Sequence, residues 1–130
     1  MKIICFFVLF FLLFNCTPPS VTYDRIIENN SSYDIWVNPP NNCFQDSILI
    51  PSNTHRILEG TIERNGSVNN FRDCPSICID TAGTSISNHD SLSLNFVLEP
   101  THPNWQYRVV QPGESGSCEC RITITDADIN

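Results

Sequence analysis

Seven cysteines in a chain of 130 residues are the side chains best able to do chemistry in this sequence. Four of them form two close pairs, Cys74 with Cys78 and Cys118 with Cys120. Thiols at such spacings cross-link an exported domain or, as thiolates, bind zinc or copper(I). The compartment in which the chain resides therefore decides which chemistry these cysteines perform.

The first residues of the chain predict export. Met1 and Lys2 form a short positive region, and twelve consecutive apolar residues follow from Ile3 to Phe14. A helix of that length is much shorter than the ~30 Å of hydrocarbon in a bilayer. The segment is therefore typical of a signal peptide. The alternative is that it remains as an uncleaved anchor.

The apolar segment ends in the letters LLFNC, with Leu13 three residues before Cys16, and Thr-Pro-Pro-Ser follows the cysteine. This arrangement resembles the lipobox of bacterial lipoproteins, although Asn15 stands where that family usually has a small residue. The resemblance implies cleavage by signal peptidase II, lipidation of Cys16, a signal peptide over residues 1–15 and an extended tether over residues 16–23. Two or three acyl chains anchor a protein stably. The sorting patterns of such lipoproteins imply the outer membrane, facing the periplasm.

The charge balance excludes two kinds of partner. Beyond Cys16, six arginines face fourteen carboxylates, which gives a formal charge near −8. Nucleic acid binding requires clustered cations, so we expect no nucleic acid partner. Anionic lipid surfaces would repel such a domain, so we expect membrane attachment through lipid alone.

Alternation with a period of two predicts an all-β domain over residues 24–130. Apolar residues alternate with polar ones in segments 33–37, 92–98, 105–110 and 118–125, and 46–50 is a short apolar run. Turn-forming segments rich in Pro, Gly, Asn and Asp separate these runs at intervals of about ten residues. We expect a small immunoglobulin-like antiparallel β-sandwich of about seven strands, with a small β-barrel as the alternative.

Once Cys5 leaves with the signal and Cys16 carries lipid, five cysteines remain, namely Cys43, Cys74, Cys78, Cys118 and Cys120. In an oxidising periplasm we expect two disulfides and one spare thiol. Cys118 and Cys120 lie on one strand face about 6.6 Å apart, at the limit of disulfide reach. We therefore expect one of Cys74 and Cys78 to bond to one of Cys118 and Cys120.

The alternative for these cysteines is a copper or zinc site, or a redox site, built from Cys74, Cys78, Cys118 and Cys120. The segment FRDCPSICID also resembles one short segment of thioredoxin-fold copper chaperones, although Ile79 replaces the proline of that family. Disulfides are our first interpretation, and we expect no cofactor and no metal.

Three short motifs, Asp46-Ser47, Asp80-Thr81 and Asp90-Ser91, each precede an apolar residue. They resemble the acceptor sequence for O-glycosylation of exported proteins in some bacteria. The resemblance implies glycan on Ser47, Thr81 and Ser91, and turn chemistry at the start of a strand is the alternative. We expect Glu59 and Glu63 to share a solvated strand face.

No sequence pattern predicts catalysis. The segment QPGESGS resembles the serine motif of chymotrypsin-like proteases, but a Gly/Ser turn explains it better. We expect a binding or structural module of the cell envelope, with a protein or glycan partner. Trp36 and Trp105 are its candidate contacts, because aromatic side chains beside polar ones are frequent in recognition sites. Burial in the core is the alternative for both, and the expected outcome for Trp105.

Overall fold

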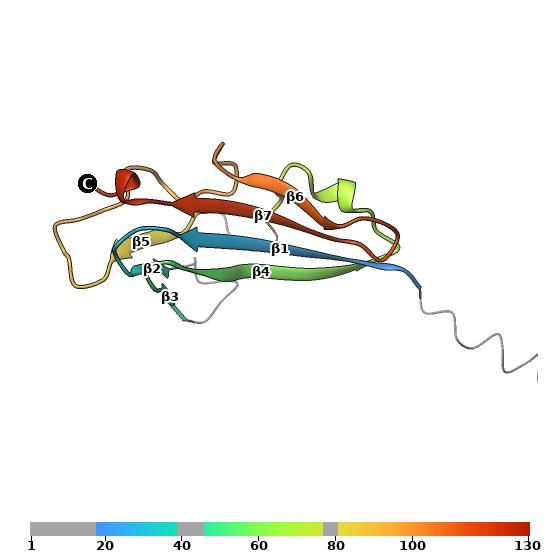
Figure 1. The fold of residues 1–130 in the computed structure, drawn as a ribbon, viewed down its shortest axis with the longest axis horizontal. Helices are drawn as coiled ribbons and strands as arrows, with labels where there is room; N and C mark the ends of the chain where they lie inside the picture. The colour runs from blue at the N-terminus through green and yellow to red at the C-terminus, as the bar shows by residue number, and fades with distance from the viewer. Residues whose placement is uncertain (1–17, 39–45, 77–80) are drawn as a thin grey trace, which may run out of the picture.

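The computed structural model describes residues 18–38, 46–76 and 81–130, and it confirms the all-β prediction. These residues form seven strands in two sheets of four and three strands, which do not close into a barrel (Figure 1). Two short 3-10 helices, η1 (Val68–Phe71) and η2 (Asp126–Asp128), lie between and after the strands. The strands are β1 (Ser20–Asn29), β2 (Ile35–Asn38), β3 (Ile48–Ile50), β4 (Thr54–Arg64), β5 (Gly83–Ile86), β6 (Gln106–Gln111) and β7 (Ser117–Ile124).

The larger sheet has the order β4-β1-β7-β6, and the smaller has the order β3-β2-β5. β1 is antiparallel to β4 but parallel to β7, so the sandwich is not wholly antiparallel (Figure 1). Residue alternation is the same in both kinds of pair, and it could not have predicted this feature. β1 begins at Ser20, so residues 20–23 belong to the sheet and not to the extended tether predicted over residues 16–23.

The inner face of the larger sheet is covered by two different structures, which form two neighbouring cores. At one end the smaller sheet packs on it, and the first core contains Ile27, Leu58, Ile122 and Ile124 with Ile35, Val37, Ile50, Ala82, Ile86 and Leu98. At the other end η1 and the chain after it form the cover, and the second core contains Val21, Tyr23, Phe71, Cys74, Cys118 and Cys120.

The segment 92–98 does not form the strand that we predicted. Its ladder contacts are two isolated bridges, from Leu94 to Ile129 and from Leu98 to Ala82. The apolar residues at alternate positions nevertheless pack on the first core, namely Leu92, Leu94, Phe96 and Leu98. Its backbone bonds go to the carboxy-terminal residues, since Asn95 N donates to Asp128 O at 2.9 Å. The alternation of apolar residues therefore predicted correctly which side chains of this segment are buried, but its prediction of a strand was wrong.

Candidate functional site

Trp36 lies on the outer face of the smaller sheet, as its position between two buried residues predicts. Ile35 and Val37 on either side of it are fully buried, whereas Trp36 is half-buried. β2 is the central strand of this sheet, so Trp36 has a neighbour on each side, Leu49 on β3 and Ser85 on β5. The indole is thereby fixed on a sheet and not on a loop.

A groove of about 490 Å3 opens beside this indole. Its volume falls within the range of small-ligand sites, roughly 300–1,000 Å3. The groove combines one aromatic surface with hydroxyl, amide, imidazole and carboxylate groups. Its lining consists of Trp36, residues Thr84, Ser85 and Ile86 of β5, and then Ser87, Asn88, His89, Asp90 and Leu92.

The turn that supplies the polar wall of the groove is held at several points. Ser87 N donates to Asp34 O at 2.8 Å, and Asn88 has a positive φ of 60°, which asparagine tolerates better than most residues. The ring of His89 lies edge-on to Tyr33, with 5.2 Å between the ring centroids. The imidazole is therefore placed by packing before any ligand arrives.

Trp105, the second candidate contact, packs against both cores and is half-buried. Its Nε1 donates to Glu99 O at 3.0 Å. The guanidinium of Arg25 lies over its ring, 3.9 Å from the centroid. Trp105 therefore covers the buried guanidinium of Arg25. We assign Trp105 a role in the structure and not in recognition of a partner.

Arg25 is the buried residue that sequence reasoning missed. It is 1% exposed and lies on the inner face of β1, between the two cores. Its Nη2 donates to Pro100 O at 2.8 Å, and its Nε has no hydrogen-bond partner among the residues that the structure describes. Burial lowers the pKa of Arg25, and the neighbouring Tyr23 and Glu59 oppose that effect. A buried arginine in such surroundings requires the nearby acid.

That acid, Glu59, corrects the expectation that Glu59 and Glu63 share a solvated face. Glu59 is buried directly opposite Arg25 in the β1–β4 ladder, and Glu63 is exposed. Ser76 Oγ donates to Glu59 Oε1 at 2.7 Å. Alternation placed the two glutamates together on one side of β4, but only the central one is covered by the chain after η1.

Cys74 and Cys120 form a disulfide that links the chain after η1 to β7. It joins one member of each close pair, which is the connection expected from the sequence. The bond ties together residues 46 positions apart and lies within the second core. It also removes two of the four thiolates required by the metal alternative. Cys16, Cys43 and Cys78 lie outside the described residues.

Cys118 is the free cysteine within the described part of the chain, and it is buried. Its Sγ lies 3.8 Å from Thr22 O. Burial raises the pKa of the Cys118 thiol, and the neighbouring Tyr107 hydroxyl only partly opposes this. A buried, protonated thiol is a poor nucleophile, so Cys118 serves as a core residue.

The three serine and threonine residues of the glycosylation motifs are exposed. Ser47 precedes β3, Thr81 precedes β5, and Ser91 follows the turn that lines the Trp36 groove. Exposure is what a glycan on these positions would require. Asp80 of the second motif lies outside the described residues.

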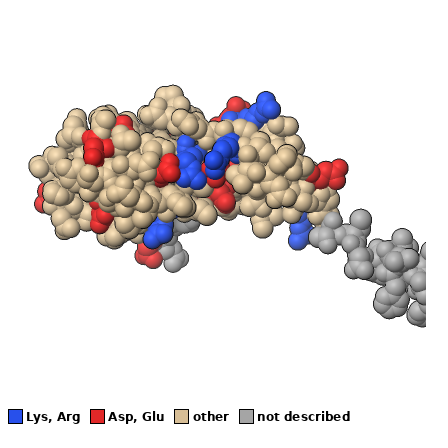
Figure 2. Space-filling view, viewed as in Figure 1, with Lys and Arg blue, Asp and Glu red and all other residues tan. Residues whose placement is uncertain are grey.

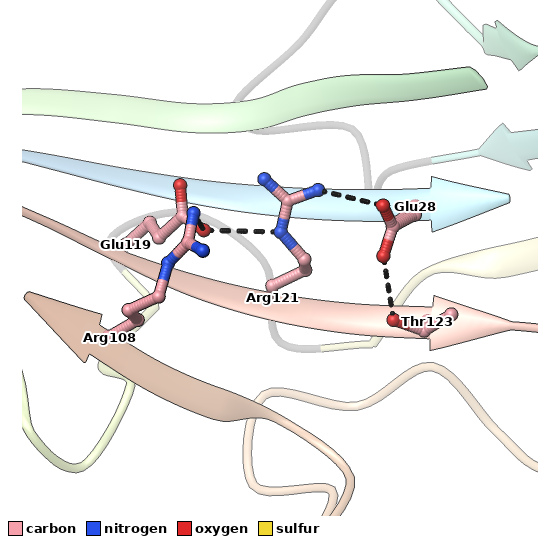
Figure 3. Close-up of polar contacts among 5 residues, drawn as sticks. All are labelled: Glu28, Arg108, Glu119, Arg121 and Thr123. Carbon is pink, nitrogen blue, oxygen red and sulfur yellow. Dashed lines mark hydrogen bonds and ion pairs between the residues drawn. The ribbon is translucent and has the colours of Figure 1, made fainter. Parts of the chain in front are cut away.

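A strip of charged side chains crosses the outer face of the larger sheet (Figures 2 and 3). Glu119 Oε1 accepts from Arg108 Nη2 at 2.8 Å and from Arg121 Nε at 3.1 Å. Arg121 Nη1 contacts Glu28 Oε1 at 3.2 Å, and Thr123 Oγ1 donates to Glu28 Oε2 at 3.0 Å. Two arginines thus balance two glutamates, and the strip binds β1, β6 and β7 together.

Asp24 lies beside this strip, opposite Glu119 on the adjacent strand. Partial burial, and then the charge of Glu119, raise the pKa of Asp24. The arginines are engaged with Glu28 and Glu119, so the strip offers no surplus of positive charge to an anionic ligand. We therefore assign it a structural role.

Within residues 18–38, 46–76 and 81–130, no group of three or more His, Cys, Asp or Glu side chains could hold a metal ion. The same residues include no helix with the length and hydropathy to span a membrane. No protein-family model, curated protein or solved structure matches this chain.

Proposed function

We propose that this chain is an exported lipoprotein, anchored to the outer membrane through Cys16 and facing the periplasm, whose sandwich is a non-catalytic binding module. The anchor is supported by the sequence from Lys2 to Cys16, a positive residue, a short apolar segment and a cysteine in a lipobox-like setting. The folded sheet begins four residues after that cysteine, at Ser20, which suits a domain held close to a surface.

The groove beside Trp36 is the observation that carries the binding part of the proposal. A half-buried indole on a central strand loses little conformational entropy when it binds a ligand, because the sheet already fixes its position. Large aromatic side chains that are fixed in this way are the commonest energetic centres of recognition sites.

The chemistry of the groove fits a saccharide. A sugar ring presents an apolar C–H face and a rim of hydroxyl groups, and the indole offers the matching flat apolar surface. Ser85, Ser87 and Asn88 supply neutral donors and acceptors at the rim, while His89 and Asp90 supply stronger ones. If no saccharide binds, the result favours a protein as the ligand of this groove.

Replacing Trp36 by alanine is expected to weaken saccharide binding about 30-fold, the loss typical of an energetic centre of a binding site. The measurement uses the detergent-solubilised full chain on an array of neutral, N-acetylated and acidic oligosaccharides, followed by titration of the strongest binder. His89→Ala should weaken the same binding to a smaller degree.

His55→Ala is the matched control, because His55 is an exposed histidine on β4 in the other sheet. It should leave the affinity unchanged. Thermal melts of all three variants check that the sandwich still folds. Wild-type chain that binds no oligosaccharide, or binding that survives Trp36→Ala, contradicts the assignment of this groove to a saccharide.

A further inference from the structure

In the described part of the chain β4 is an outer strand of the larger sheet, and it carries two exposed isoleucines. Among the described residues it pairs with β1 in the sheet order β4-β1-β7-β6. Ile57 is 53% exposed and Ile62 is 69% exposed. A long outer strand with large apolar side chains is a template for pairing with a further strand, and natural proteins usually protect such an edge.

A β-bulge puts the two isoleucines on the same face. The β1–β4 register shifts between Arg25 and Ile26, so that Leu58 is an extra residue on β4. Ile57 lies opposite Ile26 and Ile62 lies opposite Thr22, both on the outer face. Without the bulge, residues five apart would point to opposite faces of the sheet.

The sequence of β4 is complementary to itself in one antiparallel register. The bulge makes Leu58 and Glu59 count as one position of the strand, so the two-fold axis passes between Gly60 of one copy and Gly60 of the other. In that register Ile57 of one copy faces Ile62 of the other. In the same register Arg56 faces Glu63, and both of these side chains are exposed. Each pair occurs twice, because a two-fold interface repeats every contact.

We propose that two copies of this chain associate through antiparallel β4–β4 pairing in this register. The pairing joins the two larger sheets into one continuous sheet and satisfies the outer backbone groups of both β4 strands. The bulge is present in both copies, so the segments on either side of the axis remain in register. Gly60 lies at the axis and faces Gly60 of the other copy, where the absence of a side chain permits close approach.

Neighbouring registers are worse on the same criteria. A shift of two residues keeps the outer faces matched but places Ile62 opposite His55, or Ile57 opposite Arg64. A shift of one residue turns inner-face side chains toward outer-face ones. Only the proposed register matches apolar with apolar and acid with base, which argues for a second copy as the occupant of this edge.

The test is the mass of the full chain in detergent, measured by sedimentation over a concentration series. Wild type should be dimeric at high concentration. Arg56→Glu should weaken dimerisation at least about tenfold, because two attractive cross-strand pairs become repulsive. Adding Glu63→Arg to the same chain restores opposite charges in the reversed order and should return the dissociation constant to within about threefold of wild type.

Val110→Lys is the control, since Val110 is a similarly exposed aliphatic residue on β6, the opposite outer strand. It should leave dimerisation unchanged, whereas Ile62→Lys should abolish it. A wild-type chain that stays monomeric at the highest soluble concentration overturns the proposal. So does a doubly substituted Arg56→Glu, Glu63→Arg chain that remains as weak as the single variant.

Discussion

Replacing both Cys74 and Cys120 by alanine is expected to lower the free energy of unfolding by about 4 kcal/mol, the loop-closure value for a cross-link over 46 residues. For a domain of this size that loss lowers the melting temperature by roughly 20 °C. The expected effect is large because the disulfide bonds the chain after η1 to β7. That segment covers the second core on the inner face of the larger sheet. Urea unfolding of the oxidised chain measures the loss.

Cys118→Ala is the control for this prediction. Cys118 lies on the same strand and the same face as Cys120 and is equally buried, but it is not bonded to another cysteine. Its replacement should cost only about 1 kcal/mol, the typical effect of a small change in a core. If the double variant is no less stable than Cys118→Ala, the disulfide does not hold the second core together.

Arg25→Met is expected to destabilise the fold by about 3 kcal/mol, although methionine replaces a charged side chain with an apolar one. The substitution removes the cation over Trp105 and leaves Glu59 buried without the charge opposite it. Removal of a buried cation is costly when a neighbouring buried carboxylate remains desolvated. Thermal and urea unfolding of the full chain measure the effect.

Two further variants separate charge from packing at Arg25. Adding Glu59→Gln to Arg25→Met should recover part of the lost stability, because a neutral amide costs less to bury than a carboxylate that has lost the cation opposite it. Arg72→Met, at an exposed arginine that donates to Asn69, should change stability by no more than about 0.5 kcal/mol. A result in which Arg25→Met is as mild as Arg72→Met contradicts the role of the buried cation.

The strands that were predicted well are those with one apolar face. β2 and β7 alternate without interruption, and Cys118, Cys120, Ile122 and Ile124 all point inward as expected. Turn chemistry was equally informative, since Asn53, Asn65, Asn88 and Gly113 have positive φ and lie in short segments rich in Pro, Gly, Asn and Asp. Strand faces and turns depend on residues that are close together in the sequence, so they can be predicted from a local pattern.

β1 escaped prediction because its inner face is not wholly apolar. Arg25 and Asn29 occupy inward positions, and each is accommodated by partners far along the chain. Asn29 Nδ2, for example, donates to Ile50 O at 3.0 Å. Partners of this kind are not visible in a local pattern. The same holds for the parallel β1–β7 pair and for the groove, whose lining comes from β2, β5 and the turn after β5.

The central claim, that this is a lipid-anchored exported module, is tested most directly by incorporation of radiolabelled palmitate in growing bacteria. We expect label in the wild-type chain and in Cys5→Ala, which alters the other cysteine of the amino-terminal segment, and none in Cys16→Ala. A wild-type chain that is exported but takes up no palmitate would contradict the account and favour an uncleaved anchor.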